Sequence, residues 1–140
     1  MTDISALDEH ALEEMLSKPS KQTGEVVAEL KGDIVVLGAG GKMGPTLAMM
    51  LRKASENKTV HAVSRFTNEA VKTRLEEAGV KTVQADLLDE SCHHKLPVAE
   101  NVYYLVGMKF GTTGNQPLTW ALNSFLPGAV ARRYKNARIV

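Results

Sequence analysis

A glycine-rich turn at residues 38–44, reading Gly-Ala-Gly-Gly-Lys-Met-Gly, directly follows the apolar run 34–37. An unbroken apolar run is typical of a strand that helices cover on both faces. A helix beginning at about Lys42 would point its free N–H groups and the positive end of its dipole at the turn. A turn of this kind binds phosphates, and the sequence predicts a cradle for the pyrophosphate of a dinucleotide.

The glycines of this turn have separate expected roles. Gly38 is expected to make the tight turn, and Gly44 to let the helix pack closely on the strand. Between them, Gly40 or Gly41 leaves the backbone bare so that a pyrophosphate can approach.

The glycine spacing leaves a second interpretation open. Met43 stands where the strict G-x-G-x-x-G pattern requires glycine, so the chain offers G-x-x-G-x-x-G instead. Without a ligand, the same residues would form a plain corner between a strand and a helix. Lys42 could reach a phosphate but is expected to face solvent, and Met43 is expected to cover the cofactor or to pack between helix and strand. No Gly-Lys-Ser or Gly-Lys-Thr follows at the spacing of a nucleoside-triphosphate loop.

Ser64 and Arg65 stand at the end of the second expected strand, about twenty positions after the glycine turn. At this place an acidic residue binds the free ribose hydroxyls of NAD, whereas an arginine accommodates the additional phosphate of NADP. No carboxylate stands here, and a guanidinium holds a phosphate through two parallel hydrogen bonds. The sequence therefore favours NADP over NAD, with a merely solvated arginine as the alternative.

Asp86 and Leu87 follow the third expected strand. Asp86 could accept a hydrogen bond from the adenine amino group while Leu87 covers the ring. The equally weighted alternative is an aspartate that stabilises a turn or caps a helix.

Val106 ends the fourth expected strand and Gly107 and Met108 follow it, where the order of strands in such a sheet reverses. Ligands bind at this point, so the three residues are expected beneath the nicotinamide ribose. The glycine-rich run that continues through Phe110 and Gly111 to Asn115 is expected to be mobile, either as a lid or as a disordered segment.

Cys92, His93 and His94 invite a metal interpretation. Adjacent residues rarely converge on one ion, and no second cluster supplies the remaining ligands, so no metal site is predicted. Cys92 is the only cysteine, which rules out an intramolecular disulfide and favours a reducing compartment.

The elements that must position these residues alternate between strands and helices. Strands are predicted at 34–37, 59–64, 80–84, 102–106 and 138–140. Helices are predicted from about 42 to 54, at 67–78 with Thr67 as cap, at 89–95, and at 117–134 with a break at Pro127. This alternation gives an α/β fold, a doubly wound Rossmann-type parallel sheet in the order 3-2-1-4-5 with helices on both faces. Residues 1–32 are predicted to form a helical extension, with Ser5 capping its first helix, and residues 33–140 the dinucleotide-binding domain.

The composition is that of an ordinary globular protein, with 44% hydrophobic residues, 24% charged residues and a net charge of +1. Nucleic-acid and membrane-surface partners usually require a clustered basic excess, so neither is expected. No signal peptide and no bilayer-spanning apolar run is evident, and a cytoplasmic location is the expectation.

The turn 38–44, the pair Ser64-Arg65, the run 85–87 and the strand-loop 103–107 together resemble the extended short-chain dehydrogenase/reductase group, the NAD-dependent epimerase/dehydratase family. The resemblance covers residues 33–140. It implies the cofactor-binding half of an enzyme that moves a hydride between a nicotinamide cofactor and a hydroxyl or carbonyl substrate such as a nucleotide sugar.

The family's catalytic tyrosine and lysine lie four positions apart, beyond the fifth strand. Tyr103, Tyr104 and Tyr134 are not followed by lysine at that spacing, so no catalytic residue is assigned. Hydride transfer then lacks its proton partner. We expect the amino-terminal part of a larger enzyme, cut at the fifth strand and inactive alone. The alternative is a non-catalytic NADP(H)-binding sensor or interaction module, and bare apolar faces would let either form a homodimer.

Overall fold

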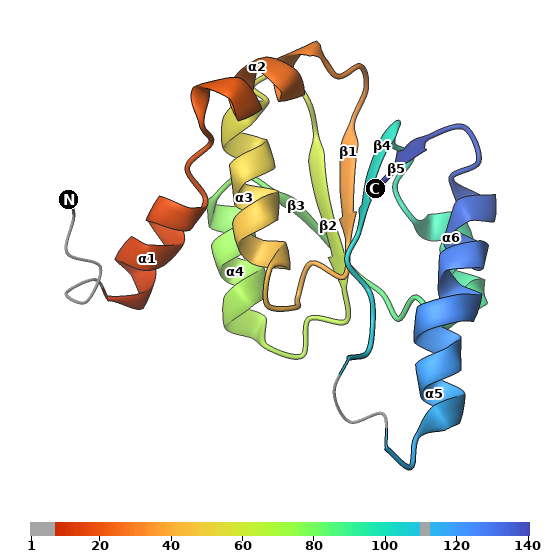
Figure 1. The fold of residues 1–140 in the computed structure, drawn as a ribbon. Helices are drawn as coiled ribbons and strands as arrows, with labels where there is room; N and C mark the ends of the chain where they lie inside the picture. Colours follow the sequence, from red (N-terminus) through yellow and green to blue (C-terminus); the bar gives the residue numbers. More distant parts are fainter. Residues whose placement is uncertain (1–7, 110–112) are drawn as a thin grey trace.

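The computed structural model describes residues 8–109 and 113–140, which form a parallel five-stranded sheet with helices on both faces (Figure 1). The strands are β1 (Ile34–Leu37), β2 (Val60–Ser64), β3 (Lys81–Gln84), β4 (Asn101–Tyr104) and β5 (Arg138–Ile139). Their order is β3-β2-β1-β4-β5. The predicted fold class and strand order are therefore confirmed.

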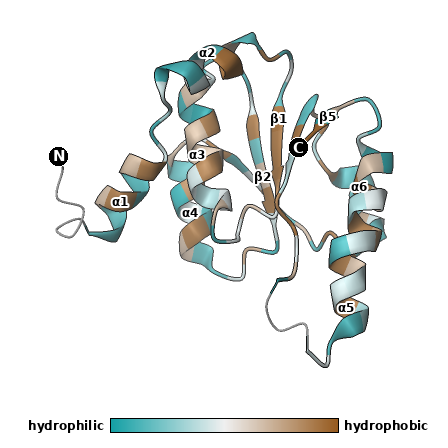
Figure 2. Ribbon diagram, in the orientation of Figure 1, coloured by the Kyte–Doolittle hydropathy of each residue, from teal (hydrophilic) through white to brown (hydrophobic). Residues whose placement is uncertain are grey.

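Strand β1 is the centre of the fold because β2 and β4 pair with it on either side. Successive side chains of a strand point to opposite faces. Ile34 and Val36 accordingly pack into one apolar cluster, and Val35 and Leu37 into another. Figure 2 shows apolar residues along β1 and β2 at the centre of the fold. The unbroken apolar run is thus explained by burial on both faces.

Two layers of helices cover the sheet (Figure 1). One layer contains α3 (Gly44–Ala54) and α4 (Glu69–Glu77), with α1 (Glu9–Leu16) and α2 (Lys21–Glu29) outside it. The other contains α5 (Gln116–Trp120), the π-helical turn η3 (Ala121–Phe125) and α6 (Leu126–Arg133). The 3₁₀ turn η2 (Glu90–Lys95) connects β3 with β4. No helix in the described part of the chain is long and apolar enough to cross a membrane.

Three helix boundaries differ from the prediction. The helix after the glycine turn begins at Gly44, two residues later than expected, because residues 41–43 form a bend. Asn68 caps α4 in place of Thr67, since its Oδ1 accepts the Ala70 N–H at 3.0 Å. The predicted cap Ser5 lies outside the described residues, and α1 begins after Asp8, which caps it.

The predicted break at Pro127 takes the form of the π-helical turn η3, which ends at Phe125, two residues before this proline. A proline lacks an N–H, and its ring collides with the carbonyl four residues earlier. The helix is widened before the proline, and the Leu126 N–H donates to the Ala121 carbonyl five residues earlier.

The helices α1 and α2 attach to the domain differently. Val27 of α2 is only 3% exposed and belongs to the apolar cluster on the α3 side of the sheet. No residue of α1 is buried. It is held by charge, through Lys53 Nζ at 2.9 Å from Glu14 Oε2 and Arg74 Nη1 at 3.2 Å from Glu13 Oε2.

Candidate functional site

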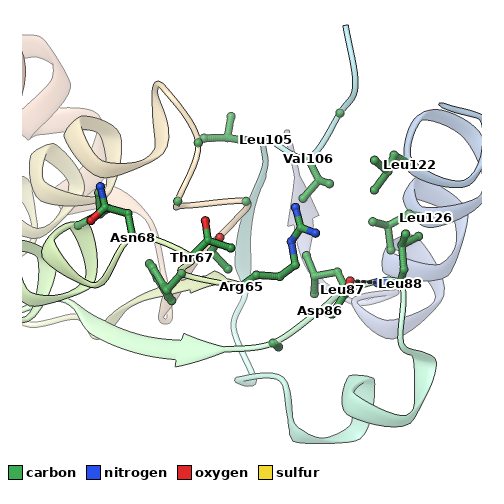
Figure 3. Close-up of a pocket in the computed structure, with 18 of the residues that line it drawn as sticks. Arg65, Thr67, Asn68, Asp86, Leu87, Leu88, Leu105, Val106, Leu122 and Leu126 are labelled. Carbon is green, nitrogen blue, oxygen red and sulfur yellow. Dashed lines mark hydrogen bonds between the residues drawn. The ribbon is translucent and has the colours of Figure 1, made fainter. Parts of the chain in front are cut away.

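A cavity of about 290 Å³ lies at the carboxyl ends of β1, β2, β3 and β4 (Figure 3). Several residues predicted to bind the cofactor line it, namely Gly38, Gly40, Gly41, Ser64, Arg65, Asp86, Leu87, Val106 and Gly107. Four others do not line it, namely Lys42, Met43, Gly44 and Met108. Since β1 sits between β2 and β4, the cavity lies where the strand order reverses, the position at which open α/β sheets bind ligands.

Gly38 makes the tight turn that the sequence predicts. Its φ is +85°, in the region that favours glycine, and an added Cβ would lie 3.0 Å from the backbone of Leu105 and Val106. The Gly38 and Ala39 N–H groups both donate to the Val63 carbonyl, at 2.9 and 3.1 Å. The turn is thereby fixed to the end of β2.

Gly44 lets α3 approach the strand closely, as predicted. A Cβ on Gly44 would lie 2.5 Å from both the Cα and the carbonyl oxygen of Ala39, well inside van der Waals contact. At Gly40 the nearest atom to a Cβ would be the Ser64 hydroxyl oxygen, at 2.6 Å, which belongs to a side chain. At Gly41 the nearest atom would be the Gly38 carbonyl oxygen, at 3.3 Å. The close packing of helix on turn therefore depends chiefly on Gly44.

The amino terminus of α3 leaves donors for an anion. Its first hydrogen bond runs from the Leu47 N–H to the Met43 carbonyl at 3.1 Å, so the amides that precede Leu47 are not used by the helix. Lys42 is exposed, as predicted. Met43 is 65% exposed, so the expectation that it packs between helix and strand is wrong.

Arg65 follows β2, and Figure 3 shows its side chain pointing into the cavity. No carboxylate lies within ion-pair distance of its guanidinium among the described residues. The Ser64 hydroxyl lies beside Gly40 at the same edge. An uncompensated cation next to a glycine turn is suited to a second phosphate.

Asp86 forms the turn that was one of its two predicted roles. Its Oδ1 accepts the Leu88 N–H at 3.0 Å, while its side chain remains exposed at the cavity wall. Leu87 is 6% exposed and packs in the apolar cluster with Leu126, yet it also lines the cavity. A planar ring could lie against this wall.

Met108 is held by a residue that the sequence did not reveal. The Asn123 Oδ1 accepts the Met108 N–H at 2.7 Å, and the Asn123 Nδ2 donates to the Met108 carbonyl at 2.8 Å. This pair of bonds fixes the loop that continues from Val106 and Gly107 on the cavity wall. Phe110 and Gly111 lie outside the described residues.

The second group that the sequence missed is an apolar wall opposite the glycine turn. It consists of Leu88, Leu118, Leu122 and Leu126, whereas Leu105 lines the cavity beside Gly38. The helical spacing of Leu118 and Leu122 predicted a stripe that packs on the domain. Periodicity alone gave no sign that this stripe also faces a cavity.

The matches to known proteins come from structure and not from sequence. No protein-family model matches the chain, and no curated protein matches its sequence. The ADP-L-glycero-D-manno-heptose-6-epimerase of Helicobacter pylori matches with a TM-score of 0.68 and 15% identity, over 78% of this chain and 38% of that one. The UDP-glucuronic acid 4-epimerase of Bacillus cereus in complex with NAD matches with a TM-score of 0.60 and 15% identity, over 76% of this chain and 38% of that one. The L-threonine dehydrogenase of Clostridium difficile matches with a TM-score of 0.61 and 21% identity, over 76% of this chain and 34% of that one.

The chain shares its fold with the corresponding part of these epimerases. The resemblance seen in the sequence is therefore confirmed at the level of this epimerase fold. The chain spans less than half of the length of each of the three enzymes.

Two tyrosines, Tyr104 at the end of β4 and Tyr134 directly after α6, are engaged by the backbone. The Tyr104 hydroxyl donates to the Leu122 carbonyl at 3.2 Å, and the Tyr134 hydroxyl to the Pro97 carbonyl at 2.9 Å. Burial raises the pKa of each to about 12. Neither hydroxyl is suited to general acid/base work near neutral pH.

The Cys92-His93-His94 run has structural contacts. The His93 Nε2 lies 2.7 Å from the Leu87 carbonyl, and the Cys92 thiol donates to the Asp86 carbonyl at 3.2 Å. Burial raises the pKa of the Cys92 thiol. Among the described residues, no group of three or more His, Cys, Asp or Glu side chains could hold a metal ion.

Proposed function

We propose that this chain is the NAD(P)-binding part of an epimerase, dehydratase or reductase. The observation that carries the proposal is the glycine turn 38–44, whose open face lines a cavity at the point where the strand order reverses. Residues 33–140 would form the binding domain and residues 1–32 its helical extension. The bound cofactor would supply or accept a hydride.

The chain's own residues would hold the parts of the cofactor separately. The pyrophosphate would meet the free amides at the start of α3, with Gly40 and Gly41 allowing its approach. The adenine would lie against Leu87 and the leucine wall. The nicotinamide ribose would lie over Val106 and Gly107.

NADP is the cofactor that we favour. The compared epimerase is described with NAD, so the preference for NADP depends on Arg65, whose guanidinium has no ion-paired carboxylate among residues 8–109 and 113–140. A guanidinium in this position would hold the 2′-phosphate, and the Ser64 hydroxyl would add a hydrogen bond.

The substrate would be a small hydroxyl or carbonyl compound, such as a nucleotide sugar, bound by a part of the protein that this chain does not contain. We also propose a cytoplasmic location. The second candidate is a non-catalytic NADP(H)-binding module, and it is favoured by the tyrosines at 104 and 134, whose raised pKa and backbone partners withhold them from proton transfer.

Calorimetric titration of the purified chain with NADPH and NADH tests the binding proposal. We expect NADPH to bind more tightly than NADH. Gly41→Asp would place a carboxylate where the pyrophosphate binds and would weaken both by more than about tenfold. Gly24→Asp adds the same charge on α2, where no atom lies within 4 Å of a Cβ, and should change neither affinity. A folded chain that binds neither cofactor would contradict the proposal.

A further inference from the structure

The backbone directly after Arg65 adopts an unusual conformation. Phe66 has a φ of +45°, the only positive φ at a residue other than glycine among those the structure describes. Phenylalanine rarely adopts this left-handed region, because its Cβ crowds the neighbouring backbone. Such a conformation persists only where the surroundings hold it, and it occurs preferentially at binding sites.

Burial of the Phe66 ring holds this conformation. The side chain is 4% exposed and packs in the apolar cluster with Ala39, Ala48 and Leu75. The ring also lies close to Gly40, since its Cδ1 is 3.8 Å from where a Cβ on that glycine would lie. The glycine turn and the segment after β2 are therefore packed against each other through this ring.

Gln84 holds the same segment from the other side. It is the last residue of β3 and lies in register with Ser64. Its Nε2 donates to the Arg65 carbonyl at 2.9 Å, and the Ala85 N–H donates to the Ser64 carbonyl at 2.9 Å. Gln84 is exposed and does not line the cavity.

The Arg65 backbone is thus fixed at its carbonyl and at the residue that follows, whereas its side chain extends into the cavity (Figure 3). Binding a phosphate costs less conformational entropy when the backbone that carries the guanidinium is already ordered and directs it into the cavity.

We propose that Gln84 is a positioning residue for the 2′-phosphate of NADP, acting through Arg65, with the buried Phe66 ring as the second anchor. This inference rests on the proposed function, because it assumes that Arg65 meets the 2′-phosphate. It extends the specificity determinant from the end of β2 to a side chain of the neighbouring strand.

The test compares Gln84→Met, which keeps the side-chain length and removes the donor, with Arg65→Met and with Gln22→Met on the exposed surface of α2. The probes are adenosine 2′,5′-bisphosphate and adenosine 5′-monophosphate, which differ only in the 2′-phosphate. The readout is the dissociation constant of the monophosphate divided by that of the bisphosphate, both measured by calorimetry. A merely structural role of Gln84 would weaken both probes alike and leave the ratio unchanged.

We expect Arg65→Met to reduce the ratio by about 30-fold and Gln84→Met by about threefold to tenfold, while Gln22→Met leaves it as in the wild type. Each variant should melt within about 2 °C of the wild type, because all three side chains are exposed. If Arg65→Met reduces the ratio and Gln84→Met does not, the positioning role is refuted and the NADP assignment stands. If Arg65→Met leaves the ratio unchanged, both the assignment and the positioning role are refuted.

Discussion

Replacing Gly44 by alanine tests whether the close packing of α3 on the glycine turn is needed for the fold. The added methyl group would lie 2.5 Å from the Cα and the carbonyl oxygen of Ala39 and 2.6 Å from its carbonyl carbon. All three atoms belong to the backbone, so no side-chain rotation can relieve the collision. Contact between such atoms normally begins at about 3.5 Å. The start of α3 must therefore move away from the turn by about 1 Å.

This displacement lowers the free energy of unfolding because it disturbs the packing of α3. The helix buries Ala48 and Leu51 against the sheet, and both lose contacts when its first turn moves. Overpacking of this kind costs about 1–3 kcal/mol. Because only backbone atoms stand opposite the methyl group, we expect the upper end, about 3 kcal/mol. In a domain of this size the melting temperature would fall by about 10 °C.

The matched control is Gly24→Ala in α2, where an added Cβ meets nothing within 4 Å. Alanine in a helix interior is favoured over glycine by about 1 kcal/mol, so this variant should be more stable than the wild type. Urea unfolding followed by circular dichroism measures both free energies of unfolding. Replacing glycine by alanine should thus lower the free energy of unfolding at position 44 and raise it at position 24. A Gly44→Ala variant as stable as the wild type would refute the packing argument.

Two further perturbations test other parts of the structure. Burial lowers the pKa of His61, with Lys81 adding to the effect and Asp33 opposing it, so the unfolded chain binds the proton more readily and stability falls as the pH drops below about 6.5. The urea midpoints measured at about pH 7.5 and about pH 5.5 should therefore differ less in His61→Gln than in the wild type. An unchanged difference would contradict the role of His61. The control is His10→Gln, on the exposed face of α1. Asn123→Leu removes both hydrogen bonds to Met108 and should weaken the binding of NADPH by about tenfold, at about 1 kcal/mol or less for each bond. The affinity for adenosine 2′,5′-bisphosphate should not change, because this ligand does not reach that loop. Equal weakening of both ligands, measured by calorimetry, would show that Asn123 does not act on the nicotinamide side.

The parts of the fold that depend on local chemistry could be predicted from the sequence. The run 34–37 is apolar at every position because both faces of β1 are covered, and this alone indicated a central parallel strand. Gly38 and Gly44 had predictable roles, since a positive φ and a close backbone approach both exclude a side chain. The place of Arg65 at the cavity was predictable because its distance from the glycine turn follows from the length of one helix and one strand.

The features that were missed depend on contacts between distant segments. Asn123 contacts Met108 from η3, the π-helical turn before Pro127, and a proline in a sequence does not reveal which form the break takes. Met43 looked like a core residue by type, but the bend at 41–43 turns it to solvent. The conformation of Phe66 follows from where its ring is buried, which no local pattern encodes.

The most direct test of the cofactor site is a titration of the ¹⁵N-labelled chain with NADPH and NADH, followed through its amide resonances. We predict that both cofactors shift the amides of residues 38–44 and of Val106 and Gly107, and that NADPH shifts those around Arg65 more strongly. Shifts confined to other parts of the chain, or no shifts in a folded protein at millimolar cofactor, would contradict the account.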